Sequence, residues 1–252
     1  GDIQVRNFTD LSLGRSFIAH QEGVNCAAFA PDHSWLITGG NEKAIKFWDL
    51  YQCSLVHKLD GHGNNVTSLL TTWPAEEDRD ADRKFFRVIS GSEDKSIRVW
   101  DVDLDLKSKV RNNSKQGSKK DRGVWETKSI GSLATVPEFY YRDDHVIIQG
   151  HYEPINVVRF LDYETLITGS DDGTIKIWDY GTMRLMRTLE GHTDYISDIR
   201  VSQDGTLFFS SSYDKTVRVW EIETATQVRV FPSHQKAINS LCEILEAQQL
   251  IA

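Results

Sequence analysis

The sequence predicts an all-β fold in which small four-stranded antiparallel sheets repeat around a common axis. The first observation behind this prediction is an alternating strand that ends in tryptophan and an acidic residue. It occurs four times, as AIKFWDL, SIRVWDV, TIKIWDY and TVRVWEI. The second observation is a Gly-His or Ala-His pair ahead of each phrase, at His20, His62, His151 and His192. Self-similarity with a period of about 42 residues is the signature of a repeat architecture.

The unit that covers residues 191–232 shows the expected strands most clearly. Alternating or continuous apolar runs predict four strands, and turn signals such as Gln203-Asp204-Gly205 separate them. A sheet of this size cannot bury both of its faces alone, so neighbouring units must stack against one another. The strands expected in this unit are 196–201, 206–210, 216–221 and 227–230.

The spacing between histidine and tryptophan divides the chain, which we take as one domain of residues 1–252, into units. Four units are clear, and they are 20–61, 62–150, 151–191 and 192–233. The two ends, 1–19 and 234–252, each carry half a unit. We expect these halves to join into one composite fifth sheet that closes the ring without a free edge. Further units can lie in 102–149 or outside this chain.

The two ends are incomplete in complementary ways. In the first, residues 3–5 match the strand that carries tryptophan elsewhere, but Arg6-Asn7 replaces Trp-Asp. In the second, Ser233-His234 opens the unit, and 238–241 and 249–252 match its first and second strands. Each end therefore supplies the strands that the other lacks.

Unit 62–150 is longer than its neighbours because of insertions near 73–86 and 102–145. The second insertion begins after Trp100-Asp101, either in the loop after the third strand or within the fourth strand. Since strands alternate in direction, loops after the first and third strands leave a sheet at the same end. The first insertion is acidic, and the front of the second, 107–122, is basic. Two interpretations stay open: a pair of solvated loops, which chains tolerate easily, or a docking site for a partner.

Composition and charge exclude several classes of function. A net charge of −8 and a pI of about 5.5 argue against direct nucleic-acid binding, which requires a basic surface. No apolar run approaches the length of a membrane span, and the start of the chain lacks a signal-peptide pattern. Cys26, Cys53 and Cys242 are scattered and odd in number, which is typical of reduced thiols. We expect an intracellular protein, cytoplasmic or nuclear, without membrane insertion.

The repeats resemble those of the WD-repeat β-propeller family over nearly the whole chain, except the middle of the second insertion. The resemblance implies a β-propeller of four-stranded antiparallel blades. It also implies a hydrogen-bonded tetrad in each blade: the histidine of the pair, a Ser or Thr on the second strand, an Asp in the following turn and the tryptophan. The tetrads implied here are His62, Ser90, Asp94 and Trp100; His151, Thr168, Asp172 and Trp178; and His192, Ser210, Asp214 and Trp220.

The first unit departs from this pattern, because Glu42 stands in the acid position beside His20, Thr38 and Trp48. A longer acid fits that turn less well. Buried polar groups that satisfy one another in series hold a turn against a strand. The Ser-His-Asp triplets are therefore expected to be structural, since a catalytic triad needs an accessible nucleophile. We find no phosphate-binding loop and no HExxH motif, and we predict no cofactor, no metal site and no enzymatic activity.

Partners of the family commonly bind the face where each fourth strand turns into the next first strand. Two kinds of position point to that face: residues just after the histidine, among them Gly63, Pro154 and Thr193, and the residue before the tetrad acid. The tyrosines among them suit interface anchors, and the acids favour Lys or Arg on a ligand. The candidate binding residues are Gln21, Asn41, Asn65, Glu93, Tyr152, Asp171, Tyr195, Tyr213 and Gln235.

The function expected from these features is a non-catalytic scaffold or adaptor for protein–protein interaction. It would bind a peptide or domain, with basic side chains favoured, as a subunit of a larger hetero-complex. Two alternatives stay open, a propeller-fold enzyme and a purely structural assembly subunit. An enzyme would need convergent titratable groups at the central channel, whereas the sequence shows only scattered acids.

Overall fold

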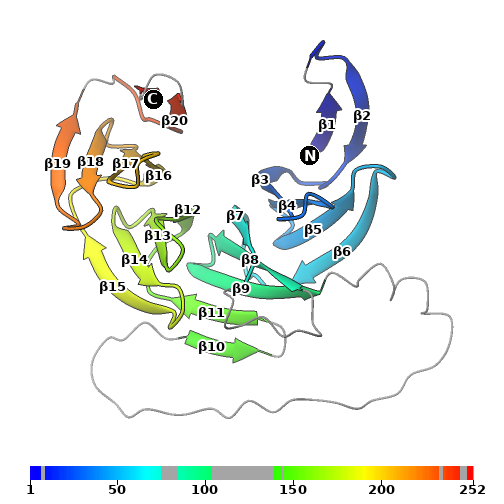
Figure 1. The fold of residues 1–252 in the computed structure, drawn as a ribbon, viewed down its shortest axis with the longest axis horizontal. Helices are drawn as coiled ribbons and strands as arrows, with labels where there is room; N and C mark the ends of the chain where they lie inside the picture. Colours follow the sequence, from blue (N-terminus) through cyan, green and yellow to red (C-terminus); the bar gives the residue numbers. More distant parts are fainter. Residues whose placement is uncertain are drawn as a thin grey trace.

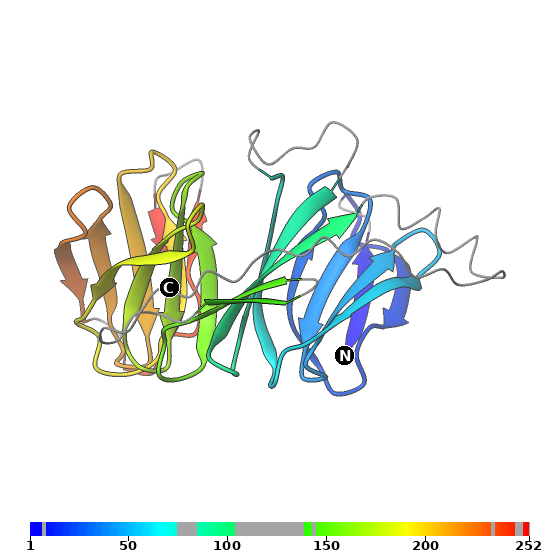
Figure 2. The same cartoon turned by 90° about the horizontal axis from the view of Figure 1, so that it is seen from below.

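Strands form all the regular structure in the part of the chain that the computed structural model describes, residues 1–6, 9–74, 85–103, 139–142, 145–232, 235–244 and 249–251. Figure 1 shows the sheets as blades that radiate from a common centre, each with its first strand innermost, and Figure 2 shows them side by side. The predicted all-β architecture of repeated antiparallel blades is confirmed.

Blades one, three and four each contain four antiparallel strands in sequential order. Blade one comprises β3 (Val24–Phe29), β4 (Leu36–Gly40), β5 (Ala44–Asp49) and β6 (Ser54–Asp60). Blade three comprises β12 (Ile155–Phe160), β13 (Thr165–Ser170), β14 (Ile175–Asp179) and β15 (Arg184–Leu189). Blade four comprises β16 (Ile196–Val201), β17 (Leu207–Ser212), β18 (Val217–Glu221) and β19 (Gln227–Phe231), close to the expected strands.

Blade two has five strands rather than four, in the order β10-β11-β9-β8-β7. Its strands are β7 (Val66–Thr72), β8 (Phe85–Ser92), β9 (Ser96–Asp103), β10 (Phe139–Arg142) and β11 (His145–Gln149). The second insertion therefore lies between the third and fourth strands, and it ends in an additional rim strand, β10, that the sequence did not predict.

The two insertions leave blade two at the same end of its strands, as expected from strand direction. Arg87 on β8 pairs with Thr72 at the end of β7, and Phe85 pairs with Asp103 at the end of β9. The bulk of both insertions, 75–84 and 104–138, lies outside the described residues. Whether the insertions form a docking site stays a prediction.

Apolar side chains from facing blades form the core between them. Trp100 of blade two belongs to the cluster that holds Phe47 of blade one, and Trp220 of blade four belongs to the cluster that holds Ile167 of blade three. Trp178 packs in the same way with Ile89 of blade two. Each repeated tryptophan thus buries its ring against the preceding blade, which makes the stacking of neighbouring units obligatory.

Polar side chains also link the innermost strands of successive blades. The second residue of each innermost strand donates a hydrogen bond to the first carbonyl of the next one: Asn25 to Val66 at 3.2 Å, Thr67 to Ile155, Asn156 to Ile196 at 2.9 Å and Ser197 to Ile238. The last of these links places Ile238 in the position that Val66, Ile155 and Ile196 occupy at the start of an innermost strand. Ile238 and Leu241 are buried there against blade four.

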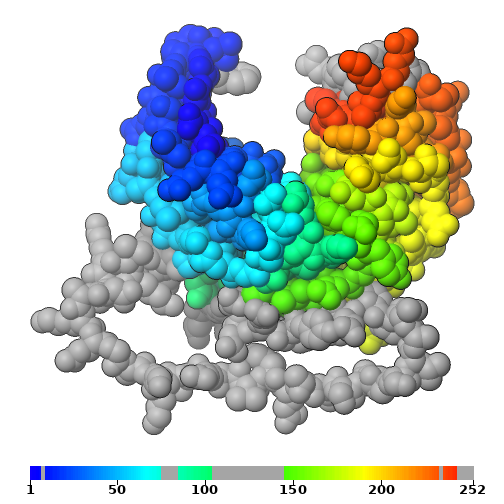
Figure 3. Space-filling view, turned by 180° about the vertical axis from the view of Figure 1, so that it is seen from behind, coloured from blue at the N-terminus to red at the C-terminus, as the bar shows by residue number. Residues whose placement is uncertain are grey.

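The two ends of the chain form separate two-stranded sheets, β1 (Asp2–Arg6) with β2 (Leu13–Ile18) and β20 (Cys242–Ile244) with β21 (Gln249–Ile251). They stand on opposite sides of an opening in the ring, as Figures 1 and 3 show. The structure does not join them into the composite fifth sheet, which stays a prediction.

The expectation of a strand at 238–241 was wrong, because strand pairing begins only at Cys242. Backbone groups of this segment form hydrogen bonds with side chains of blade four instead. Leu241 N donates to the Asp198 carboxylate at 3.1 Å, and the Leu241 carbonyl accepts from Arg200 at 3.0 Å. These contacts use the groups that sheet pairing would require.

Candidate functional site

A complete chain of hydrogen bonds joins the four tetrad positions of blade three. His151 Nδ1 lies 2.9 Å from Asp172 Oδ2, and His151 Nε2 lies 2.7 Å from Thr168 Oγ1. Trp178 Nε1 donates to the same hydroxyl at 2.9 Å. The histidine, hydroxyl and indole are buried, so the chain braces the turn before β14 against β13 and the loop before β12.

The same three bonds occur in blades two and four. In blade two, His62 lies 2.8 Å from Asp94 and 2.7 Å from Ser90, and Trp100 donates to Ser90 at 2.9 Å. In blade four, His192 lies 2.7 Å from Asp214 and 2.8 Å from Ser210, and Trp220 donates to Ser210 at 2.9 Å.

The hydrogen-bond pattern sets the protonation state of each tetrad. The carboxylate can only accept, so the histidine carries its proton on Nδ1. A neutral ring then accepts at Nε2 from the hydroxyl, which in turn accepts from the indole N–H. Burial lowers the pKa of His62, His151 and His192, and it therefore favours this neutral form.

The tetrad carboxyls are held ionised despite being partly buried. Burial alone would raise the pKa of Asp214, but hydrogen bonds from Thr216 and His192 bring it down to about 2. The pKa values of Asp94 and Asp172 are lowered further for the same reason, with the histidine bond as the main opposing contribution.

Blade one lacks the acid–histidine bond. His20 and Trp48 each contact the Thr38 hydroxyl at 2.9 Å, but His20 Nδ1 lies 3.7 Å from Glu42 and is buried without a hydrogen-bond partner among the described residues. Glu42 instead accepts from Lys46 and from the Gln21 backbone N–H. The longer acid reaches past the histidine, which leaves this tetrad incomplete.

We expect acidification to destabilise the protein in two stages. The folded-state pKa is below the unfolded value both for the buried histidines and for the tetrad aspartates. Each contribution is therefore present above the unfolded pKa and is lost as pH falls through the folded one. As the pH falls, the stability contributed by the neutral histidines is lost first, below about pH 6.5. The stability contributed by the ionised aspartates is lost next, below about pH 4. Urea denaturation at several pH values measures this loss. A free energy of unfolding that stays constant or increases as the pH is lowered from about 7 to about 5 would contradict it.

The tetrads position the candidate binding residues directly. In blades two to four the acid also accepts from the backbone N–H of the residue after the histidine: Gly63 at 2.8 Å, Tyr152 at 3.1 Å and Thr193 at 3.2 Å. The loop that carries the first set of candidates is thereby fixed at its start.

The structure brings the two sets of candidates together in every blade. The residue before the tetrad acid donates its backbone N–H to a carbonyl of the loop after the histidine. The pairs are Asn41 to Gly23 at 3.2 Å, Glu93 to Asn65 at 3.0 Å, Asp171 to Pro154 at 2.9 Å and Tyr213 to Tyr195 at 3.0 Å. The two kinds of position thus form neighbouring loops on one face.

The candidates differ in how much surface they offer. Tyr152 is 73 % exposed, and Tyr195 and Tyr213 are 47 % and 44 % exposed with ring centroids 5.7 Å apart. Gln21 and Gln235 are also exposed, whereas Asn41, Asn65, Glu93 and Asp171 are half-buried. Asn41 and Asp171 each accept from an asparagine of the interblade links, Asn25 at 2.8 Å and Asn156 at 2.6 Å. Asn41 and Asp171 therefore also stabilise the contacts between neighbouring blades.

The junction of blades two and three carries negative charge. Burial raises the pKa of Asp171, and the charges of Glu93, Glu153 and Asp172 raise it further, although Asn156 opposes them. Lys95 offsets part of this charge, since it lies 3.3 Å from Glu153 and donates to the Tyr152 carbonyl at 2.6 Å. A cationic side chain brought to this junction would be attracted.

Metal-binding clusters, membrane-spanning helices and disulfides are all absent from the part of the chain that the structure describes. They contain no group of three or more His, Cys, Asp or Glu side chains that could hold a metal ion. Across the same ranges, no helix is long and apolar enough to cross a bilayer. Cys26, Cys53 and Cys242 form no disulfide with one another, and burial raises the pKa of Cys26 to about 12.

Comparison with known families settles the origin of the repeats. The family described as "WD domain, G-beta repeat" matches residues 11–49, 53–101, 144–179 and 183–221. The chain belongs to the WD-repeat family. Each matched segment begins with the strand that precedes a blade (β2, β6, β11 or β15) and continues through that blade's first two strands into its tryptophan strand. The resemblance read from the tryptophan phrases is confirmed.

Curated WD-repeat relatives are distant in sequence. Mitochondrial division protein 1 of Schizosaccharomyces pombe is 27 % identical over 202 residues, which is 78 % of this chain and 27 % of the relative. Nuclear distribution protein nudF of Aspergillus niger is 26 % identical over 92 % of this chain and 43 % of its own length. Autophagy-related protein 16 of Arabidopsis thaliana is 24 % identical over 78 % and 38 %. The chain spans less than half the length of each of these relatives.

Sequence reasoning missed one residue with many contacts, Asp198 on β16. Its side chain is buried and accepts from Arg200 at 3.2 Å, from Ser240 at 3.0 Å and from the Leu241 N–H, and it lies 3.4 Å from Arg159 of blade three. The available signal was an acid at an inward position of an apolar innermost strand. It joins blade three, blade four and the start of the fifth unit.

Proposed function

We propose that this WD-repeat chain is a non-catalytic adaptor that binds a peptide or protein domain on the face formed by the loops after the histidines. The observation that carries the proposal is the set of exposed tyrosines, Tyr152, Tyr195 and Tyr213, held on a braced scaffold. Rigid aromatic side chains offer a large contact area at a small cost in conformational entropy.

The charge of the face supports a partner with a lysine or arginine next to an apolar side chain. The cation would lie at the junction of blades two and three, beside Glu93 and Asp171. The apolar neighbour would pack on the Tyr195 and Tyr213 rings, which are already in contact. The partner would then bridge blades two to four.

A non-catalytic role is supported by the state of the serine, histidine and aspartate groups. The hydroxyls of Ser90, Thr168 and Ser210 are buried and already accept from an indole N–H. A nucleophile must reach a substrate. The tetrads therefore act as braces.

The names of the relatives state three different processes, mitochondrial division, nuclear distribution and autophagy. A shared scaffold with varied loops accounts for such breadth. We accordingly propose that this chain works inside the cell, in the cytoplasm or nucleus, as one subunit of a hetero-complex. The partner is set by the tyrosine-bearing loops.

Replacing Tyr195 and Tyr213 together with alanine is expected to reduce partner recovery by roughly tenfold or more, because interface tyrosines are frequent hot spots. Quantitative affinity purification from cell extract measures this against the parent protein. The matched control replaces Tyr51 and Tyr163, which are 85 % and 98 % exposed on turns at the opposite end of the blades. Unchanged recovery in the first variant, or equal loss in both, would place the binding site elsewhere.

A further inference from the structure

In each of blades one to four, the turn between the second and third strands places one residue in the left-handed region, directly after the tetrad acid. Glycine fits this backbone conformation most easily, because it has no Cβ atom. The four residues are Lys43, Lys95, Gly173 and Lys215, with φ angles of 62°, 70°, 74° and 69°. Blade three therefore lacks the lysine that the other three blades carry at this turn.

In blade two this lysine reaches the loop of the next blade. Lys95 Nζ donates to the Tyr152 carbonyl at 2.6 Å and lies 3.3 Å from the Glu153 carboxylate. Tyr152 and Glu153 are the first and second residues after the histidine of blade three. An ammonium group has three donors and no acceptor. A carbonyl and a carboxylate from these two positions together make a site for it.

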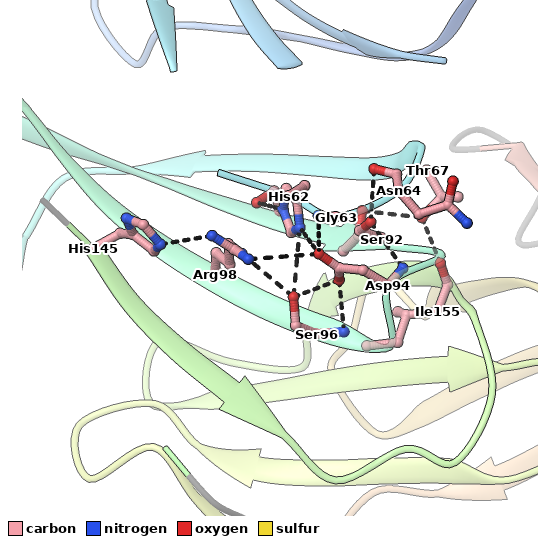
Figure 4. Close-up of polar contacts among 12 residues, drawn as sticks. His62, Gly63, Asn64, Thr67, Ser92, Asp94, Ser96, Arg98, His145 and Ile155 are labelled. Atoms are coloured by element: carbon pink, nitrogen blue, oxygen red, sulfur yellow. Dashed lines mark hydrogen bonds and ion pairs between the residues drawn. The ribbon is translucent and has the colours of Figure 1, made fainter. Parts of the chain in front are cut away.

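Two hydrogen bonds within a blade fix the first and second positions after its histidine. In blade two, the Gly63 N–H donates to Asp94 at 2.8 Å, and the Ser92 hydroxyl donates to the Asn64 carbonyl at 3.2 Å, as Figure 4 shows. The acid and the serine both lie next to the turn that ends in Lys95, so the turn holds the loop in place. The same pair of bonds in another blade identifies the equivalent positions there.

The loop of blade four presents the same two acceptors at its junction with blade three. The Thr193 N–H donates to its tetrad acid at 3.2 Å, as the Tyr152 N–H does at 3.1 Å. The Asp194 carbonyl accepts from the serine that ends the second strand at 3.0 Å, and the Glu153 carbonyl does so at the same distance. Thr193 and Asp194 are therefore the equivalents of Tyr152 and Glu153.

Blade three brings no side chain to these acceptors. A Cβ atom on Gly173 would lie 3.2 Å from the His192 carbonyl and 3.5 Å from the Asp194 carbonyl, so this turn already lies against the loop of blade four. Asp194 is exposed, and its carboxylate accepts from the Tyr195 N–H at 2.9 Å. It forms no ion pair with any side chain that the structure describes. The acceptors that Lys95 fills at one junction are thus open at the next.

The neighbouring junctions do not combine an acid with a missing lysine. The first and second positions of blade two are Gly63 and Asn64, which carry no charge, and blade one supplies a lysine there. The corresponding positions after blade four are Gln235 and Lys236. Within the described ranges, Asp194 is the one acid at these positions whose matching lysine is absent.

We infer that the junction of blades three and four binds a lysine side chain of the partner, which takes the place of the lysine that blade three lacks. The ammonium would donate to the Thr193 carbonyl and pair with the Asp194 carboxylate, as Lys95 does with its own acceptors. Tyr195 follows Asp194 directly, so an apolar residue beside that lysine would reach the Tyr195 and Tyr213 rings. This lysine site rests on the proposed function and adds a second cation position to its binding face.

NMR titration of the full chain with two peptides tests this site. One peptide is acetyl-Gly-Phe-Lys-Gly-amide, and the other has norleucine in place of lysine and so lacks the ammonium. The reporters are the backbone amides of Thr193, Asp194 and Tyr195. We expect the lysine peptide to bind roughly fivefold more tightly at these amides, the size of a favourable exposed ion pair. Equal affinities, or a response confined to other loops, would overturn the inference.

Gly173→Lys supplies the missing ammonium from the protein itself, on a backbone whose φ angle is close to that of Lys95. It should abolish the advantage of the lysine peptide. The matched control, Gly205→Lys, adds the same charge at a left-handed turn residue at the opposite end of blade four, where a Cβ atom would meet no non-adjacent residue within 4 Å. The control should keep the advantage.

Asp194→Asn removes the charge but keeps an acceptor for the Tyr195 N–H, so it should also lose the advantage of the lysine peptide. An advantage of parental size in either Gly173→Lys or Asp194→Asn would overturn the inference. If Gly173→Lys does not fold, the parent protein and Asp194→Asn still decide the question.

Replacing Tyr195 and Tyr213 with alanine separates the lysine site from the proposed function. Weaker binding of both peptides, with no lysine advantage in the parent protein, would leave the binding face standing and would overturn the lysine site. A lysine advantage that persists at the Thr193 and Asp194 amides without the two rings would support the lysine site and contradict the role given to the tyrosines.

Discussion

Replacing Asp172 with alanine is expected to lower the free energy of unfolding by about 3 kcal/mol. The carboxylate accepts from His151 at 2.9 Å, from the Tyr152 N–H at 3.1 Å and from the Thr174 N–H at 2.9 Å. Alanine would leave the buried His151 N–H with only the Thr174 hydroxyl, 3.4 Å away, and would release the loop that carries Tyr152. Urea denaturation at neutral pH measures the loss.

The matched control is Glu42→Ala at the same position of blade one. Glu42 makes no bond to its histidine, which lies 3.7 Å away. Its removal costs only its contacts with Lys46 and with the Gln21 N–H, so it should lower the free energy of unfolding by about 1 kcal/mol. A brace that acts through the acid–histidine bond requires this difference. Equal losses in the two variants, or a parental midpoint for Asp172→Ala, would show that the bond does not stabilise the blade.

Replacing Asp198 with alanine is also expected to lower the free energy of unfolding by about 3 kcal/mol, because it removes the acceptor from a buried charged cluster. Asp198 is 5 % exposed and contacts Arg159, Arg200 and Ser240. Among the described residues, it is the one acidic side chain in this cluster. The C-terminal segment should detach first, since Leu241 N loses its partner.

Limited proteolysis distinguishes this local effect from a general one. Cleavage within 235–244 should become faster in Asp198→Ala than in the parent protein, while cleavage in blade one should change little. Asp198→Asn keeps the size and one acceptor oxygen, so it should fall between the two. An alanine variant with parental stability and parental cleavage would refute the role given to Asp198.

Much of the scaffold was predictable because it depends on local spacing. The alternating phrase before each tryptophan specifies a strand, and its distance from the histidine brings both to one hydroxyl at 2.7–2.9 Å in blades two to four. The incomplete tetrad at Glu42 could also be predicted, because one extra methylene changes the position that a carboxylate reaches. Both inferences use chemistry contained within one repeat.

Other features depended on contacts between repeats. Nothing near Asp198 in the sequence indicates that its partners come from blade three and from residues 240–241. Strand β10 follows a long insertion and pairs with β11 only after the chain returns to the rim. His145 and Gln227 each pair with the tetrad tryptophan of their blade, and this shared position becomes visible only once the strand register is known.

The sequence by itself determined the repeated blade, its strands, the tetrad positions and the membership of the WD-repeat family. These follow from periodicity, which short-range sterics and side-chain alternation impose on every copy alike. The tertiary structure decided which loops meet on the candidate face and which polar groups are shared between blades. Those outcomes depend on packing between segments far apart in the chain, where the pattern within one repeat carries no information.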